Sequence, residues 1–318
     1  MYCFRLQKRK NLKPDVDLKA INFVLLLFSL FISCGKLHNN SVNLIEVKDD
    51  LGNQIILNEI PKKIVSLAPN ITETLFALGA DSLIAGVTNY CDFPESARNK
   101  FKVGGMIDPD LELIISLNPD LIIVTIEGNS ISTYKRLTTL GYKVFATNPR
   151  NFEGVIKMVK DLGILTNKKS ESDMLISKMK NKKQDILLQS NNQIKDSCFI
   201  IISVTPLMTI NKNTFINEIV ELSGFINSYG DESSPYPEIS WEDLIAKKPE
   251  YFILPGNLKD TISTKKIIIS IKEKLKINIR ESTQKFLLID EDLFFRPGPR
   301  MLEAAEHLLY LKSIKKNK

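Results

Sequence analysis

The sequence of 318 residues carries few side chains whose type and spacing could perform catalysis. Two histidines, His38 and His307, are too few for a His-rich zinc site, and the four cysteines form no CxxC pair. The glycine patterns GxGxxG and GxxxxGK are absent, as is the GxSxG elbow of hydrolases. An enzyme is therefore the weaker hypothesis, and we predict no catalytic residue and no metal site.

Cys34 is placed for covalent modification by lipid. Six basic residues precede a mainly apolar run from Ala20 to Ser33, and the stretch Leu30–Cys34 resembles a bacterial lipobox. The run has 14 residues, whereas a spanning helix needs about 20. We predict that residues 1–33 are a lipoprotein signal peptide and that Cys34 is lipidated. The alternative is an ordinary signal peptide followed by an incidental cysteine.

Cys91 and Cys198 are the cysteines that remain after residues 1–33 and Cys34 are set aside. A disulfide between them is possible in an oxidising compartment, but their spacing gives it no support. We therefore expect both to be small buried or half-buried residues.

The charge balance argues against a nucleic-acid partner. The chain has 43 basic and 37 acidic residues, a net charge of +6. Residues 1–33 hold six of the basic and two of the acidic ones, so the remainder carries 37 minus 35, or +2. Nucleic-acid-binding proteins gather basic residues on one face, and such a small excess does not indicate one.

Short apolar runs alternate with helical patterns in the first half of the chain. We predict strands at 64–67, 83–87, 121–125 and 144–145. Helices are expected at 71–78 and 134–140, with a third that begins at Asp108 as N-cap and Pro109 as first residue. This alternation predicts a parallel sheet with helices on both faces.

The second half repeats the pattern. Residues 244–254 echo 114–124, because each stretch is a helix end, a proline-acid turn and a strand. Strands are expected at 199–204 and 287–289, and helices at 214–222, after Ser240 and from Met301 onward. We therefore predict an N-terminal lobe at 61–165 and a C-terminal lobe at 193–318, preceded by a tether and N-terminal edge segment at 34–60.

A connecting helix is expected at residues 166–192. Ser170–Gln189 contains 20 residues without glycine or proline, and a helix of that length measures about 30 Å. We predict an α/β protein with two Rossmann-like lobes, each with a mainly parallel sheet, joined by one long rigid helix. The alternative is a solvated helix that packs on one lobe only.

Several motifs in this order resemble the helical-backbone metal receptors, the substrate-binding proteins of ABC importers for vitamin B12, ferric siderophores and haem. They cover residues 64–311 and include Lys63–Glu73, Val87–Pro94, Val103–Gly105, Leu111–Ile123 and Arg296–Arg300. The members that bind vitamin B12 are the most similar. The resemblance implies the two-lobed fold and a ligand cleft between the lobes.

The resemblance also implies two docking glutamates. In that family a glutamate on the first helix of each lobe pairs with arginines of the membrane permease, and Glu73 and Glu221 occupy those places. For Glu73 the alternative is a capping box, because Asn70 precedes it by three residues. For Glu221 the alternative is a solvated helix charge, and Glu218 is a rival one turn away.

The resemblance places ligand-binding residues on both lobes. Aromatic faces suit a flat corrin or porphyrin, and a few polar groups orient it. Arg300 is expected to be structural, and Trp241 either lines the cleft or packs against a helix. The implied ligand-binding residues are Tyr90, Met106, Tyr236, Asp292, Phe294 and Arg296.

Met106 and Tyr236 stand where the vitamin B12 receptors have larger aromatic residues, so two ligand classes remain open. We predict a lipid-anchored monomer, in the periplasm or on the outer face of the cytoplasmic membrane, that delivers cobalamin or a related corrinoid to an ABC permease dimer with its ATPase subunits. A ferric siderophore or haem is the alternative cargo. No resident cofactor is expected, and a surface adhesin is the competing non-enzymatic class.

Overall fold

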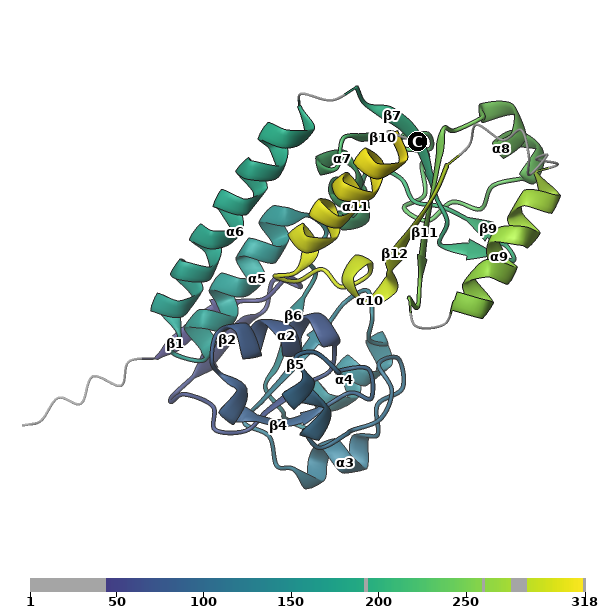
Figure 1. Cartoon of the computed structure of the whole chain (residues 1–318). Helices are drawn as coiled ribbons and strands as arrows, with labels where there is room; N and C mark the ends of the chain where they lie inside the picture. Colours follow the sequence, from purple (N-terminus) through teal and green to yellow (C-terminus); the bar gives the residue numbers. More distant parts are fainter. Residues whose placement is uncertain (1–43, 192–193, 259–260, 276–284, 317–318) are drawn as a thin grey trace, which may run out of the picture. The chain divides into compact units, whose positions relative to one another are not determined.

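The computed structural model describes residues 44–191, 194–258, 261–275 and 285–316. Two four-stranded parallel sheets lie within these ranges, each flanked by helices (Figure 1). This confirms the predicted α/β class with two lobes built on mainly parallel sheets. The predicted signal peptide and Cys34 lie outside the described residues. No helix within the described ranges has the length and apolar character needed to cross a membrane.

The sheet of the N-terminal lobe has the order β4–β3–β5–β6, with every neighbouring pair parallel. All residues of β5 and β6 are buried, as expected for strands covered on both faces. An antiparallel hairpin precedes this sheet, although the sequence had indicated only a tether and edge segment there. The strands are β1 (Ile45–Lys48), β2 (Gln54–Leu57), β3 (Ile64–Ser66), β4 (Ile84–Val87), β5 (Leu121–Thr125) and β6 (Val144–Thr147).

Two helix starts in this lobe differ from the prediction. Asp110, not Asp108, caps the helix before β5, and its Oδ1 accepts from the backbone N–H of Glu112 and Leu113 at 2.9 and 3.1 Å. The helix after β3 begins at Pro69 with Ala68 as N-cap, so Asn70 lies inside it and the capping-box interpretation is wrong. The helices are α2 (Pro69–Ala77), η1 (Asp81–Leu83), η2 (Glu95–Asn99), α3 (Leu111–Ser116) and α4 (Ile131–Thr139).

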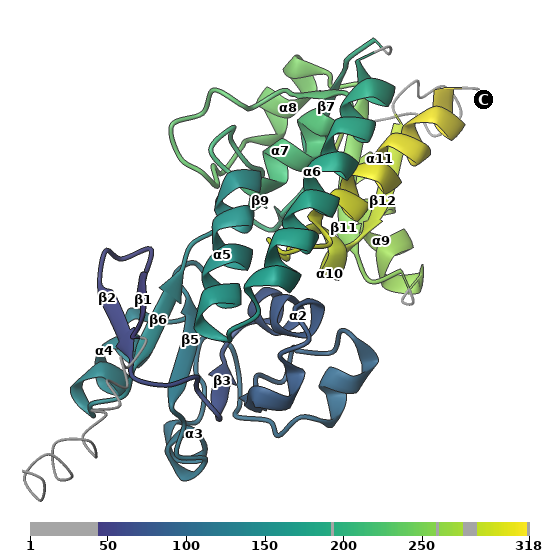
Figure 2. The same cartoon turned by 90° about the vertical axis from the view of Figure 1, so that its left-hand side faces the viewer.

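Two further helices lead from the first sheet to the second. They are α5 (Phe152–Leu165) and α6 (Lys169–Ser190), and α6 lies within the residues 166–192 where a connecting helix is expected. Helix α6 contacts α5, which follows the first sheet, and it also contacts α7 (Phe215–Leu222) and α11 (Met301–Lys316) around the second (Figure 2). The alternative in which this helix packs on one lobe only is therefore wrong.

The sheet of the C-terminal lobe has the order β10–β7–β11–β12, again with parallel neighbours. Thr214 and Ser240 cap α7 and α8 as predicted, and Ser240 Oγ accepts from the N–H of Asp243 at 3.1 Å. Helix α9 was not predicted. The remaining elements are β7 (Asp196–Ile200), the hairpin β8 (Ser203–Val204) and β9 (Leu207–Met208), β10 (Phe225–Asn227), α8 (Trp241–Lys247), β11 (Tyr251–Gly256), α9 (Thr261–Lys274), β12 (Lys285–Asp290) and α10 (Glu291–Phe294).

One apolar cluster runs through both lobes. It includes Ile71 of α2, Phe152 of α5, Ile186 of α6, Ile216 of α7 and Met301 of α11. Because these helices share buried side chains, the two sheets are held by apolar packing as well as by the polypeptide between them. Both remaining cysteines are buried free thiols, as predicted.

Candidate ligand-binding site

A pocket of about 490 Å³ is lined by residues that follow the strands of both sheets. Asn70 follows β3, Glu127 follows β5, Asn148 follows β6 and Ile202 follows β7. The carboxyl ends of parallel strands lie at one edge of a sheet, where open α/β folds place their ligands. The pocket therefore lies where the sequence predicts the ligand cleft, and its size is within the range of about 300–1,000 Å³ common to small-molecule sites.

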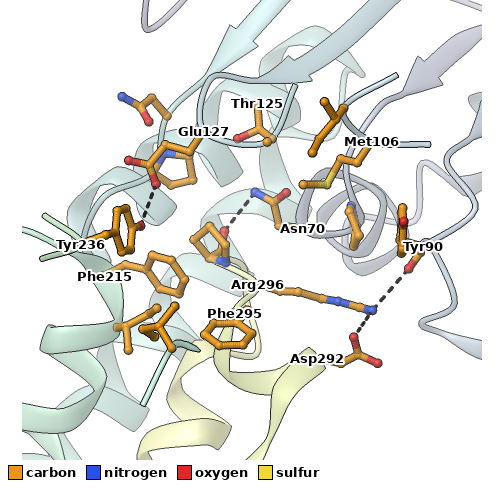
Figure 3. A pocket seen from close by; sticks show the side chains of 18 of the residues that line it. Asn70, Tyr90, Met106, Thr125, Glu127, Phe215, Tyr236, Asp292, Phe295 and Arg296 are labelled. Atoms are coloured by element: carbon orange, nitrogen blue, oxygen red, sulfur yellow. Dashed lines mark hydrogen bonds and ion pairs between the residues drawn. The ribbon is translucent and has the colours of Figure 1, made fainter. Parts of the chain in front are cut away.

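Five of the six predicted ligand-binding residues line this pocket (Figure 3). Tyr90 and Met106 come from loops of the N-terminal lobe, and Tyr236 comes from the segment before α8. Asp292 and Arg296 lie in and just after α10.

Phe294 does not line the pocket. It is fully buried in the core, and its neighbour Phe295 faces the cavity instead. Asp290 caps α10, and in this short helix residue 294 faces inward while residue 295 is its C-cap. Two adjacent phenylalanines give no sequence signal for which one is inside. Trp241 also lies away from the pocket and packs against the core of the C-terminal lobe, with Lys274 Nζ 4.8 Å from its ring centroid.

The Arg296 guanidinium is surrounded by acceptors from both lobes. Its Nη1 donates to Glu73 Oε1 at 3.0 Å and to Asp92 Oδ1 at 2.8 Å. Its Nη2 donates to Asp292 Oδ1 at 2.5 Å and to the carbonyl oxygen of Tyr90 at 3.3 Å. Because both terminal nitrogens already have two acceptors, Arg296 is poorly placed to bind an anionic ligand. It instead fixes the Tyr90 loop against the C-terminal lobe.

Asp92 and Asp292 share Arg296 but have opposite pKa shifts. For Asp92, burial would raise the pKa, but the hydrogen bond and charge of Arg296, together with Arg98, hold it below the usual value. For Asp292, burial outweighs the opposing effect of Arg296, and nearby carboxylates add to it, so its pKa is raised. As the pH falls, Asp292 therefore takes up a proton before Asp92 does.

Glu73 is buried between two arginines of the C-terminal lobe. Its side chain is 3% exposed, and Arg300 binds it in a bidentate manner, with Nε to Oε2 and Nη2 to Oε1 both at 2.8 Å. The docking role predicted for Glu73 stays a prediction, and in this structure the carboxylate is engaged by both arginines. Arg300 is structural, as expected, and its guanidinium carbon lies 3.6 Å from the ring centroid of Phe93.

A second polar cluster closes the opposite side of the pocket (Figure 3). Glu127 accepts from Arg150 Nη2 at 2.8 Å and from the Tyr236 hydroxyl at 3.5 Å, so it links residues of both lobes. Burial and the nearby charge of Glu127 raise the pKa of Tyr236 to about 12. The Tyr236 phenol therefore stays neutral, and remains a hydrogen-bond donor, well above neutral pH.

Apolar walls lie between these clusters, built by residues such as Met106, Ile202 and Phe215. The charged residues of the lining are Asp108, Glu127, Asp292 and Arg296, so acidic groups outnumber basic ones. No group of three or more His, Cys, Asp or Glu side chains within the described ranges is arranged to hold a metal ion.

Glu221 has different surroundings from Glu73. It is exposed on α7 and accepts a hydrogen bond from Asn217 Nδ2 at 2.8 Å. Its rival Glu218 is half-buried and accepts from Lys183 Nζ at 2.7 Å and from the backbone N–H of Phe152. Of the two, Glu221 is therefore the carboxylate available to a partner.

Sequence reasoning missed three residues that shape the pocket. Phe295 and Glu127 line it, and Asn70 donates to the carbonyl oxygen of Pro297 at 3.2 Å and so joins the two lobes. Glu127 and Asn70 both follow predicted strands, so the rule that ligands bind at the carboxyl ends of strands could have found them. Phe295 had no comparable signal.

The comparisons with known proteins agree with this architecture. The family described as periplasmic binding protein matches residues 64–274. The chain belongs to that family. An uncharacterized ABC transporter substrate-binding lipoprotein of Bacillus subtilis is 30% identical over 268 residues, 82% of this chain and 83% of the relative.

Two proteins named for vitamin B12 are also similar. The vitamin B12-binding protein of Photorhabdus laumondii is 25% identical over 248 residues, 78% of this chain and 86% of the relative. The crystal structure of the periplasmic vitamin B12-binding protein of Vibrio cholerae superposes with a TM-score of 0.70 at 23% identity, covering 81% of this chain and 99% of that one. At this identity the superposition supports the fold alone.

Membership of the family establishes the general activity. Periplasmic binding proteins are solute-binding proteins of ABC importers and not enzymes. The chain therefore binds a solute and works with an ABC permease. The sequence prediction that it is not an enzyme is confirmed.

Proposed function

We propose that this periplasmic binding protein captures cobalamin or a related corrinoid and delivers it to an ABC permease. The observation that carries the proposal is the charge of the pocket, whose acidic groups outnumber its one lining arginine. A ferric siderophore or haem is the alternative cargo.

The polar groups of the pocket suit a ligand that donates hydrogen bonds. Asp108, Glu127 and Asp292 are acceptors when ionised, and a carboxylate can accept further hydrogen bonds beside an ion pair such as Glu127 makes with Arg150 and Asp292 with Arg296. Both terminal nitrogens of Arg296, in contrast, already have two acceptors each. Intact corrinoids carry primary amides around their macrocycle, and each amide supplies two N–H donors. Haem carries two propionates, and many siderophores are anionic, so burying either here would bring carboxylates together without a free cation from the lining.

The edge of the pocket supports a ligand larger than the cavity itself. Tyr90 and Ile107 both line the pocket yet are 61% and 70% exposed. Side chains of this kind become buried when a flat macrocycle covers them, and the apolar contact stabilises the complex. A corrinoid would therefore fill the cavity with one part and cover Tyr90 and Ile107 with another.

The test is a titration of the purified protein with cyanocobalamin, haemin and a ferric siderophore, followed by absorption. We expect one cyanocobalamin per chain, with at least ~10-fold weaker binding of the two anionic chelates. Preferential binding of haemin or the siderophore would overturn the corrinoid proposal in favour of the alternative. Binding of none of the three would overturn both.

Docking to the permease is proposed to use Glu221. Its exposed carboxylate can form a bidentate, orientation-specific pair with a permease arginine. Docking through Glu73 would first require its pairs with Arg296 and Arg300 to open. We therefore assign Glu73 to the joining of the lobes, and we propose that the protein meets the permease dimer and its ATPase subunits as a monomer.

We propose that Cys34 carries a lipid that anchors the protein at the outer face of the cytoplasmic membrane. The basic segment, the apolar run and the cysteine support this anchor, as does the name of the Bacillus subtilis relative. Cells fed a labelled fatty acid should label the wild-type protein but not Cys34→Ser. Equal labelling of both would contradict the assignment.

A further inference from the structure

We infer that Gly128 determines the depth of the ligand pocket by giving room to the Met106 thioether. Both residues line the pocket, and they come from different loops of the N-terminal lobe. Figure 3 shows Met106 among the lining side chains. The inference rests on the proposed function for its choice of ligand, but the contact between the two residues can be tested without one.

The backbone of Met106 is fixed from behind by Asn129. The Asn129 amide nitrogen donates to the carbonyl oxygens of Met106 at 2.6 Å and of Leu67 at 2.8 Å. Its Oδ1 accepts from the backbone N–H of Thr125 at 2.7 Å. These bonds tie the Met106 loop to the ends of β3 and β5. If a neighbouring residue becomes larger, the Met106 side chain therefore moves and its backbone does not.

The Met106 side chain lies directly against Gly128. A Cβ added at Gly128 would stand 2.4 Å from Met106 Cε and 3.3 Å from its Sδ, with Thr125 Cγ2 at 2.9 Å. The first distance is far inside van der Waals contact, so the thioether could not keep its position beside an alanine. Methionine has three rotatable side-chain bonds, and its end can move where a backbone cannot.

The direction of that movement follows from the surroundings. Thr125 and Gly128 lie close to the thioether, and Asn129 holds the Met106 loop, so the open space beside the thioether is the pocket that Thr125, Gly128 and Met106 all line. An alanine at position 128 would therefore turn Met106 into the cavity and make it shallower. Gly128 has no positive φ, so alanine is compatible with its backbone, and the change acts through the side chains that the new methyl group meets, first Met106 and then Thr125.

The first test is a double-mutant cycle with cyanocobalamin. Gly128→Ala should weaken binding ~10-fold, because one methylene in a pocket changes affinity by that order. Gly128→Ala combined with Met106→Ala should bind within ~3-fold of Met106→Ala alone, because no thioether is left to enter the pocket. Gly230→Ala is the matched control. Gly230 is also free of positive φ, its added Cβ would meet Asn227 O only at 3.4 Å, and it lies outside the pocket.

The second test needs no ligand. With the methionine methyl groups labelled with carbon-13, the Met106 resonance is assigned by its loss in Met106→Ala. It should shift in Gly128→Ala and stay in place in Gly230→Ala. An unshifted Met106 methyl, an unchanged affinity in Gly128→Ala, or a loss that persists in the double variant would each overturn the inference.

The two tests separate this inference from the proposed function. If the wild-type protein does not bind cyanocobalamin, the proposed ligand is wrong, and the cycle is repeated with whichever chelate of the panel binds. The methyl resonance then still decides whether Gly128 controls the position of Met106.

Discussion

The first helices of the two lobes, α2 and α7, carry carboxylates in opposite environments. Glu73 on α2 is buried and held by Arg296 and Arg300 from the other lobe. Glu221 on α7 is exposed and bonded to Asn217 of its own helix. Segment 290–300 reaches α2 and brings both arginines with it. Repeated architecture therefore does not imply repeated surroundings, because the segments packed on each helix differ.

The largest expected effect of this difference is on stability. Glu73→Gln leaves two half-buried arginines without their shared, buried carboxylate, and we expect a loss of about 3 kcal/mol in the free energy of unfolding. Glu221→Gln, the matched control, should stay within about 0.5 kcal/mol of wild type because its site is exposed. Urea denaturation measures both. Equal losses would show that the two helices do not differ in this way.

In transport, Glu221 is the residue expected to matter. Glu221→Arg places a cation where a permease arginine would dock, and uptake of the ligand should fall at least ~10-fold while affinity is unchanged. Glu242→Arg, a charge reversal at an exposed residue of α8, should transport normally. Cellular uptake and titration of the purified variants are the measurements. Normal uptake by Glu221→Arg would remove Glu221 from the docking surface.

A smaller effect, on ligand affinity, is expected for the Tyr90 loop, which Arg296 holds in place. Arg296 binds the carbonyl oxygen of Tyr90, which places that ring at the edge of the pocket. Tyr90→Ala should weaken ligand binding ~5-fold, because one aromatic contact contributes about 1 kcal/mol to the binding free energy. Tyr310 has the same exposure of 61% but lies outside the pocket. If Tyr310→Ala weakens binding as much as Tyr90→Ala does, the loop is not part of the site.

The smallest effect, on stability at high pH, is expected for the polar cluster of Glu127, Arg150 and Tyr236. The pKa of Tyr236 is raised to about 12 from 10.0, so the folded protein retains this proton where the unfolded chain loses it. The stabilisation is complete below pH 10 and is lost as the pH rises through the folded value. Tyr236→Phe should remove one late-titrating tyrosine from the tyrosinate absorbance and flatten the loss of stability in this range. An unchanged titration curve would place the raised pKa elsewhere.

Much of the fold could be predicted because it depends on local patterns. The apolar runs of β5 and β6, the cap Ser240 and the helix without glycine or proline at 169–190 each leave a signal within a few residues. The hairpin β1–β2 was missed, because its alternation is short and lies next to a polar tether. Asp108 and Asp110 both fit a cap, and only the packing of the loop before α3 decides between them.

The site was harder to predict because its decisive contacts are long-range. Glu73 and Arg300 are 227 positions apart, and no sequence period joins them. The carboxylate therefore looked like a surface group, although it is a buried link between the lobes. The same holds for Phe294 and Phe295. Which of the two faces the core and which faces the pocket depends on how α10 packs, and the local sequence does not reveal this.

The central claim is that one ligand is held between the lobes by residues of both. Hydrogen exchange of the protein with and without cyanocobalamin tests it most directly. We expect the ligand to slow exchange in the Tyr90 and Met106 loops of one lobe and in segment 290–297 of the other. Protection confined to one lobe, or no protection at a saturating concentration, would contradict the account.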